Sequence, residues 1–256
     1  MKTILFSVLL AFSATVQAQS VLPEICETSL DDKVIQLNEN YFIKLRMISE
    51  NEYTLKKQES SHLAHKPHKG IEDVTVVKRI LGDRFIVRKG VSIESDGRSY
   101  EENLYEITFK DGEKKWFKEW AGLLFFDSYF PEVEVLFFVG GHEHPLPYDL
   151  NDSTKEPEHV GTPDYYNPSP DKQFRLNGYY HGQGFSVHFL ERWDSSKKRY
   201  EFINNLGDDG PYGDFNNAGA WFWISNRKAI GKTYRSADDD DCDQKYYEIE
   251  ILEKKR

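Results

Sequence analysis

Residues 104–117 read Leu-Tyr-Glu-Ile-Thr-Phe-Lys-Asp-Gly-Glu-Lys-Lys-Trp-Phe, and this stretch decides the fold class. Apolar and polar side chains alternate over residues 104–109 and again over residues 114–117, which is the period-two pattern of a half-buried β-strand. Between the two runs lies Asp111-Gly112, a pair that favours a primed hairpin turn because both residues accept positive φ. The stretch therefore predicts an antiparallel β-hairpin.

The same β pattern continues on both sides of this hairpin. Runs rich in Val, Ile and aromatic residues predict strands at residues 41–45, 52–55, 73–81, 84–93, 132–139, 173–176, 185–192, 199–203, 220–225 and 246–252. Only residues 118–127 are expected to form a helical turn. The pattern predicts an all-β fold of antiparallel sheets in a partial or small β-propeller-like arrangement, with a β-sandwich as the alternative.

Composition narrows the function classes. The chain has 256 residues, 33 Lys and Arg against 43 Asp and Glu, and a formal net charge of -10. Hydrophobic residues make up 39% and aromatic residues 14%, too much for a disordered chain. A negative chain without a long basic block disfavours nucleic acid as a partner, because such binding depends on neutralising phosphates. It also disfavours an anionic membrane surface.

The first 18 residues have the form of a secretory signal peptide. Lys2 is followed by an apolar stretch over residues 4–12, too short to span a bilayer, and Val16 and Ala18 form a small-residue cleavage site. We expect cleavage after Ala18. An uncleaved anchor or a buried first strand is the alternative.

The exported chain, residues 19–256, is expected to be one all-β domain with a candidate sub-boundary near residues 128–131. Its location is predicted to be the periplasm or the exterior. Since no later run is apolar over 18 residues, we expect no membrane insertion.

Two cysteines, Cys26 and Cys242, lie near opposite ends of the exported chain. In an oxidising compartment such thiols are expected to form a disulfide bond. The chain-entropy model gives this cross-link about 5 kcal/mol of stabilisation as an upper value. Two free thiols are the alternative.

Three short motifs between residues 129 and 203 carry a resemblance: Tyr-Phe-Pro-Glu at 129–132, Gly-Thr-Pro at 161–163 and Ser-Pro-Asp-Lys at 169–172. This region resembles blades of secreted bacterial β-propeller-like proteins. The last motif is similar to the Ser-Pro-Asp-Gly-Lys turn of Tol-type, WD40-like propellers, with Lys172 where that family has Gly. The resemblance implies an architecture and a binding surface, and it brings no catalytic residues with it.

A metal site is the first candidate for chemistry. His142 and His144 flank Glu143, and on a strand both imidazoles would point to one side, where they could hold Zn²⁺. Gly140 and Pro145 around them favour an ordinary surface loop instead. Acidic runs at residues 208–214 and 238–243 are weaker candidates for Ca²⁺. We therefore expect that the protein binds no cofactor. The alternative is a bound Zn²⁺ or Ca²⁺ ion.

The aromatic residues form a second candidate site. Trp221 and Trp223 are separated by one residue, so on a strand both would lie on the same face. Trp193, Tyr179 and Tyr180 lie nearby in the sequence. Exposed rings of this kind stack on sugars or anchor a protein partner. Buried rings would fill a β core.

The function expected from these patterns is an exported, non-enzymatic binding protein of the bacterial envelope. A specific form is an inhibitor or immunity-type protein that engages a protein partner, since an acidic surface speeds association with basic partners. The alternatives are a carbohydrate-binding module, in which a glycan is the partner, and a metal-dependent hydrolase at the His142/His144 loop. A Gly-x-Ser-x-Gly nucleophile motif is absent from the sequence.

Overall fold

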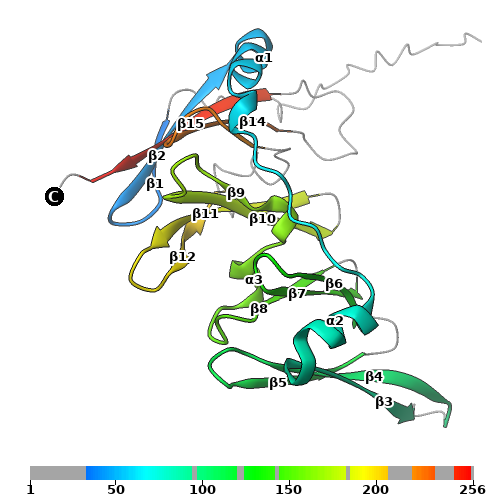
Figure 1. Ribbon diagram of the computed structural model, residues 1–256. Helices are drawn as coiled ribbons and strands as arrows, with labels where there is room; N and C mark the ends of the chain where they lie inside the picture. Colours follow the sequence, from blue (N-terminus) through cyan, green and yellow to red (C-terminus); the bar gives the residue numbers. More distant parts are fainter. Residues whose placement is uncertain are drawn as a thin grey trace, which may run out of the picture.

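The computed structural model describes residues 33–93, 97–119, 124–141, 144–182, 185–206, 221–233 and 245–254, and its strands form four antiparallel sheets (Figure 1). We number the sheets I to IV in their order in space. Sheet I contains β1 (Lys33–Gln36), β2 (Tyr41–Ile48), β15 (Lys245–Glu253), β14 (Lys228–Thr233) and β13 (Phe222–Trp223), in that order. Sheet II contains β12 (Arg199–Asn205), β11 (Phe185–Asp194), β10 (Phe174–Gly182) and β9 (Asn167–Pro168). Sheet III contains β6 (Leu124–Phe130), β7 (Val135–Gly140) and β8 (Pro145–Asp149), and sheet IV contains β3 (Phe85–Ile93), β4 (Ser99–Thr108) and β5 (Lys114–Lys118).

The helices are short. They are α1 (Glu50–Glu59), η2 (Ser61–Leu63), α2 (Val74–Leu81), η3 (Gly82–Arg84), α3 (Pro157–Val160) and η5 (Pro163–Tyr165). Among the described helices, none is long and apolar enough to cross a membrane.

The chain path places both ends of the described chain in sheet I. After β2 and α1, an extended connection runs past sheets II and III to α2, which lies beside sheet IV (Figure 1). The chain then returns through sheets IV, III and II, and its last strand, β15, pairs with β2. The expected all-β class is confirmed. Within the described residues the sheets form an open row, and no closed propeller is present.

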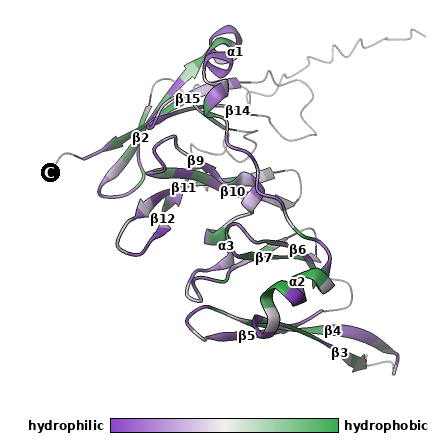
Figure 2. Ribbon diagram, in the orientation of Figure 1, coloured by the Kyte–Doolittle hydropathy of each residue, from purple (hydrophilic) through white to green (hydrophobic). Residues whose placement is uncertain are grey.

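Two apolar cores hold neighbouring sheets together. Between sheets I and II, Leu45 and Ile249 pack with Phe174 and Leu190. Between sheets III and IV, Phe138 is fully buried, and its ring lies 5.1 Å from that of Tyr105. Figure 2 shows many hydrophobic residues in α2 and in the neighbouring strands of sheet III, several of which belong to this second core.

A buried polar cluster lies between sheet II and the connection that follows β8. The Glu191 carboxylate is 0% exposed and accepts hydrogen bonds from Arg175 Nε at 2.5 Å, Lys155 Nζ at 2.9 Å and Asn177 Nδ2 at 3.0 Å. Burial by itself would raise the pKa of Glu191, but the charges of Arg175 and Lys155 outweigh burial and lower it. A buried ion cluster therefore joins the connection after β8 to sheet II.

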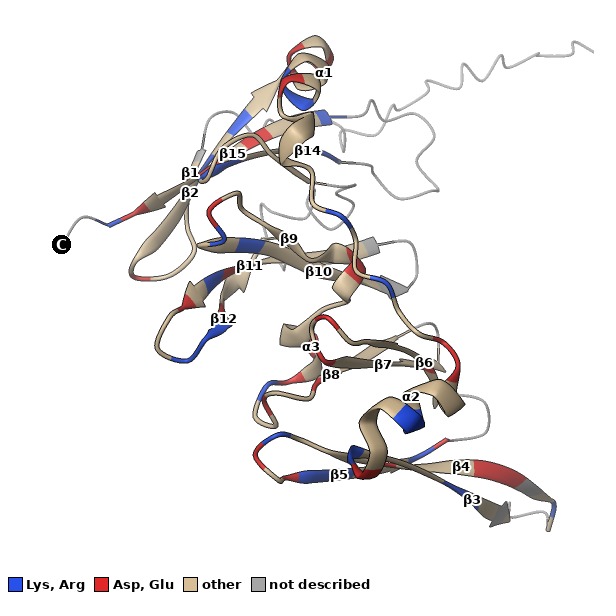
Figure 3. Cartoon of the chain, viewed as in Figure 1, with Lys and Arg blue, Asp and Glu red and all other residues tan. Residues whose placement is uncertain are grey.

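Charges within sheet IV are also paired. In sheet IV, acidic residues of β4 lie beside basic residues of β5 (Figure 3). Lys114 Nζ lies 2.8 Å from Glu106, and Lys118 Nζ lies 3.7 Å from Glu102. Much of the charge in this sheet is thus engaged in cross-strand ion pairs.

The predicted hairpin at residues 104–117 is confirmed as β4 and β5, but its turn is not the expected two-residue type. The last register pair is Thr108 with Lys114, which leaves a five-residue loop. Phe109 N–H donates to the Glu113 carbonyl, and Gly112, not Asp111, takes positive φ, at 91°. Asp111 instead accepts the N–H of Glu113 through its side chain, so the loop has one left-handed position, filled by Gly.

The strand predicted at residues 52–55 is wrong, since these residues lie in α1. Ser49 caps the helix by accepting the N–H of Glu52, and the sequence Ser-x-x-Glu is the capping-box pattern. Glu50 and Glu52 in the first turn and Lys56 in the last turn also suit the helix dipole.

The strand predicted at residues 73–81 is also wrong, since α2 occupies them. Asp73 caps this helix by accepting the N–H groups of Thr75 and Val76. Val77 and Leu81, which lie four residues apart on one helical face, are buried against sheets III and IV. The helical period outweighs the β preference of the Val residues because this face is buried in a core.

The helical turn expected at residues 118–127 is not found where the structure describes it. Lys118 ends β5 and residues 124–127 belong to β6, whose Phe126 pairs with Phe138 of β7. The pairing within sheet III decides the conformation. The candidate sub-boundary near residues 128–131 falls at the end of β6 and the start of the turn to β7.

The turn that carried the propeller resemblance connects β9 to β10. Ser169 Oγ accepts the N–H of Phe174 and donates to Asp171, which in turn accepts the N–H of Gln173. Lys172, at the family's Gly position, has a φ of 58°, the left-handed conformation that Gly adopts without strain.

The predicted signal peptide at residues 1–18, Cys26 and Cys242 lie outside the described residues. The signal peptide and the disulfide bond therefore stay predictions. The strands that follow the two cysteines, β1 and β15, begin at the same end of sheet I, since their first residues lie near Leu45 and Ile48 of β2.

Candidate binding cavity

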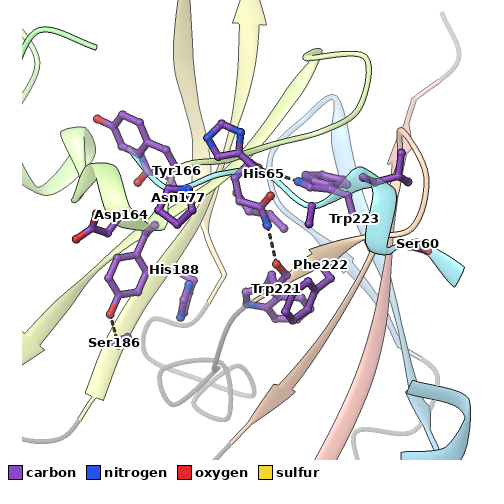
Figure 4. A pocket seen from close by; sticks show the side chains of 16 residues that line it. Ser60, His65, Asp164, Tyr166, Asn177, Ser186, His188, Trp221, Phe222 and Trp223 are labelled. Atoms are coloured by element: carbon purple, nitrogen blue, oxygen red, sulfur yellow. Dashed lines mark hydrogen bonds between the residues drawn. The ribbon is translucent and has the colours of Figure 1, made fainter. Parts of the chain in front are cut away.

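A cavity of about 540 Å³ lies between sheets I and II (Figure 4). Three segments line it: the chain at residues 60–67, sheet II with the η5 segment before it, and residues 221–223 of sheet I. Its volume is in the range of small-molecule binding pockets. The segment after α1 thus forms one side of the cavity.

The wall on the side of sheet I is aromatic and consists of Trp221, Phe222 and Trp223. Trp221 packs flat on the backbone of Gly231, where a Cβ atom would lie 2.6–2.8 Å from three atoms of the indole ring. Trp223 Nε1 donates to the Asn167 carbonyl at 2.7 Å, and Asn167 Nδ2 donates to the Trp221 carbonyl at 2.6 Å. These reciprocal bonds join β9 to the aromatic wall and fix the distance between the sheets.

The facing wall carries hydroxyl and imidazole groups. Ser186 and His188 alternate on β11 and therefore point to the same side of sheet II. The Tyr165 hydroxyl lies 3.2 Å from Ser186 Oγ, and the Tyr165 and His188 rings lie 5.7 Å apart. Gly178 pairs with His188 across the sheet, and a Cβ atom there would lie 2.3 Å from the Val187 carbonyl oxygen and 3.1 Å from His188 Nδ1. The glycine gives the imidazole room against β10.

The third side is the segment after α1, and its members are Ser60, Leu63, Ala64, His65 and Pro67. His65 is placed between the two walls in Figure 4. Burial and the nearby charge of His68 lower the pKa of His65, so its neutral form is favoured. His68 itself lies 2.6 Å from Glu132 of the turn between β6 and β7, which anchors the segment to sheet III.

The electrostatic character of the cavity is close to neutral. Among the lining residues in the described part of the chain there is no Lys or Arg, and Asp164 is the one carboxylate. Asp164 is exposed, and in Figure 4 its carboxylate points away from the aromatic wall. Partial burial of the carboxylate and the charge of Asp127 raise its pKa, whereas His68 lowers it. The cavity therefore offers few fixed charges to a ligand.

Asn177 links the cavity to the ion cluster at Glu191. Its Nδ2 donates to the Val160 carbonyl and to Glu191, and its Oδ1 accepts the N–H of Gly178. These bonds occupy the amide, so Asn177 supports the wall and does not present a free polar group. The stiffness of the polar wall thus depends on the buried ions behind it.

The structure brings two of the five predicted aromatic binding residues into the cavity. Trp221 and Trp223 line it but are only 5% and 2% exposed, so they form an inner wall and not an open stacking surface. Tyr180 pairs with Ser186 and shares its face of sheet II, at 39% exposure, while Tyr179 points to the opposite face. Trp193 lies at the far end of β11, half-buried, with its ring 5.2 Å from that of Tyr200.

The predicted metal residues lie elsewhere. His144 is exposed in the connection between β7 and β8, and His142 lies outside the described residues, as does the acidic run at 238–243. In the described ranges, no group of three His, Cys, Asp or Glu side chains is arranged to hold a metal ion. The Zn²⁺ and Ca²⁺ alternatives stay predictions.

Sequence reasoning missed the polar wall and the covering segment. The alternation of Ser186 and His188 within a predicted strand was a visible signal that both point to one side. Tyr165 and His65 gave no such signal, since each enters the cavity from a connection. Their proximity depends on how sheet II packs against sheet I.

Comparisons with protein-family models, with curated proteins and with solved structures found no match for this chain.

Proposed function

We propose that this chain is an exported binding protein that holds a small ligand in the cavity between sheets I and II. One observation carries the proposal: a cavity of about 540 Å³ with an aromatic wall on one side and a wall of hydroxyl and imidazole groups on the other. Ligand sites of this size combine apolar walls with a few converging polar groups. Export rests on the predicted signal peptide, and the expected protein partner stays a separate prediction.

The wall architecture supports binding by a preformed site. Asn167 joins both tryptophans to sheet II, and Gly178 and Gly231 let His188 and Trp221 lie close to the backbone. A site whose side chains are held before the ligand arrives loses less conformational entropy on binding.

Ligand access to the cavity can be tested by placing a bulky side chain in the segment that covers it. Ala64 lines the cavity and is exposed, so Ala64→Trp adds a large ring at the opening with little effect on folding. The matched control is Lys66→Trp, since Lys66 is also exposed on this segment but does not line the cavity.

The assay is a thermal-shift and tryptophan-fluorescence screen with neutral sugars, primary amines, indoles and short alcohols. A ligand at 100 times its Kd stabilises the folded state by about 2.7 kcal/mol, which raises Tm measurably. We expect at least one probe to raise Tm in the parent chain and in Lys66→Trp but not in Ala64→Trp. Failure of every probe, or equal binding by both variants, would show that the cavity is not the site.

A further inference from the structure

We infer that the ligand class of this cavity is an uncharged ring that carries hydroxyl groups, such as a pyranose sugar, with its apolar face toward Trp221 and its hydroxyls toward Tyr165 and Ser186. The inference rests on the proposed function and adds the chemistry of the ligand. Three properties of the cavity lead to it: charge, the type of polar group and the arrangement of the walls.

The charges of the lining residues argue against an anionic ligand. Phosphate and carboxylate ligands are bound in proteins by Arg or Lys side chains or by clusters of N–H groups. The described lining contains neither Arg nor Lys. A cation would need a carboxylate, and that of Asp164 points away from the aromatic wall (Figure 4).

The polar groups of the cavity suit a ligand that can both donate and accept hydrogen bonds. When Tyr165 and Ser186 share one hydrogen bond, the pair keeps one O–H donor and several lone pairs for a ligand. A hydroxyl group also has both roles, so hydroxylated ligands fit this wall whichever way its protons are arranged.

The two walls match the two surfaces of a sugar ring. Aromatic side chains pack against apolar faces, whereas hydroxyls at the ring edge need hydrogen-bond partners. The indole of Trp221 rests against Gly231 and is one of the side chains that line the cavity. With about 540 Å³, the cavity has room for roughly one or two sugar rings.

A sugar site in this cavity differs from an exposed surface that binds a polysaccharide. Trp221 and Trp223 are only 5% and 2% exposed, so a long polysaccharide could not lie flat across them. The site therefore fits a free mono- or disaccharide, or the end of a chain, and excludes internal segments of a polymer.

The test is calorimetry with the mature chain and defined probes: glucose, galactose, mannose, N-acetylglucosamine, maltose and cellobiose. Benzoate, tryptamine and indole serve as anionic, cationic and hydroxyl-free probes. Tyr165→Phe and Ser186→Ala each remove one hydroxyl and leave the wall otherwise intact. Tyr200→Phe is the matched control, because its hydroxyl donates to the Lys172 carbonyl outside the cavity.

We expect saturable binding of at least one sugar, weakened about five- to tenfold by Tyr165→Phe and by Ser186→Ala and unchanged in Tyr200→Phe. Ala64→Trp should remove the binding. Thermal melting of each variant shows whether it is folded. If Ser186→Ala disturbs β11, Tyr165→Phe still tests the hydroxyl pair, because it keeps the aromatic ring.

Two results overturn the ligand class and leave the cavity as a binding site. One is binding of indole, tryptamine or benzoate, blocked by Ala64→Trp, with no sugar bound. The other is a sugar that Ala64→Trp blocks but neither hydroxyl variant weakens. If no probe binds the parent chain, or if Ala64→Trp and Lys66→Trp bind equally, the proposed function itself is wrong.

Discussion

The ion cluster at Glu191 gives the sharpest prediction for stability. Glu191→Gln keeps the shape of the side chain but removes its charge, and it replaces one accepting oxygen by an N–H donor. Arg175 Nε at 2.5 Å, Lys155 Nζ at 2.9 Å and Asn177 Nδ2 at 3.0 Å are all donors, so the new amide leaves at least one of them without a partner. Arg175, which is buried, and Lys155, which is largely buried, also lose their counter-ion.

Removing one partner of a buried ion pair costs about 3–5 kcal/mol. For a chain of this size that lowers Tm by roughly 6–20 °C. Urea unfolding followed by tryptophan fluorescence should show a lower midpoint with an unchanged slope, since the surface exposed on unfolding stays the same.

A matched control is available on β12. Glu201 pairs with Arg199 at 2.5 Å and Lys197 at 3.2 Å, but its side chain is about one-third exposed. Glu201→Gln should therefore cost less than about 1 kcal/mol. A cost of Glu191→Gln no larger than that of this control would refute the reasoning.

The same cluster predicts a pH dependence. The pKa of Glu191 is lowered in the folded chain because the Arg175 and Lys155 charges outweigh burial. Its contribution to stability is present above the unfolded value of about 4.3 and is lost as the pH falls through the lowered folded value. The difference between the parent chain and Glu191→Gln should shrink in that acid range.

Four further predictions concern single sites. The pKa of His65 is lowered by burial and by the charge of a neighbouring histidine, so its contribution to stability is complete above about pH 6.5 and falls as the pH drops through the lowered value. His65→Gln should reduce this loss in urea unfolding between about pH 8 and 5. Gly231→Ala should push the indole beside it into the cavity, which shifts tryptophan emission and weakens any cavity ligand. Lys172→Gly should raise Tm by relieving a left-handed φ of 58°, a strain of about 1 kcal/mol, and a lower Tm would contradict this account. Cys26 and Cys242 should resist maleimide labelling until a reductant is added, whereas labelling of the untreated folded chain would exclude their disulfide bond.

The residues of sheet IV illustrate what local sequence determines. Alternation over residues 104–117 is a property of neighbours in the chain, so β4 and β5 could be predicted without knowing what they pack against. The capping pattern of Ser49 and Glu52 is equally local, and it was present in the sequence although residues 52–55 were predicted as a strand. Tertiary contacts decided α2, because Val and Ile residues accept both conformations and the buried face selects one.

The candidate cavity could not be read from such patterns. Its walls come from residues 60–67, 164–188 and 221–223, and no local rule states that sheet II packs against sheet I at these positions. Trp221 and Trp223 were singled out as aromatic residues, but the sequence left open whether they would be exposed or buried.

The sequence by itself determined the β class, the export prediction and the balance of charge, because each depends on composition or on spacing between neighbours. Only the tertiary structure decided that the Glu191 carboxylate is fully buried, and which residues from distant parts of the chain line one cavity. Burial and convergence arise when segments far apart in the chain pack together, and the free energy of that packing belongs to pairs of segments and not to either one alone.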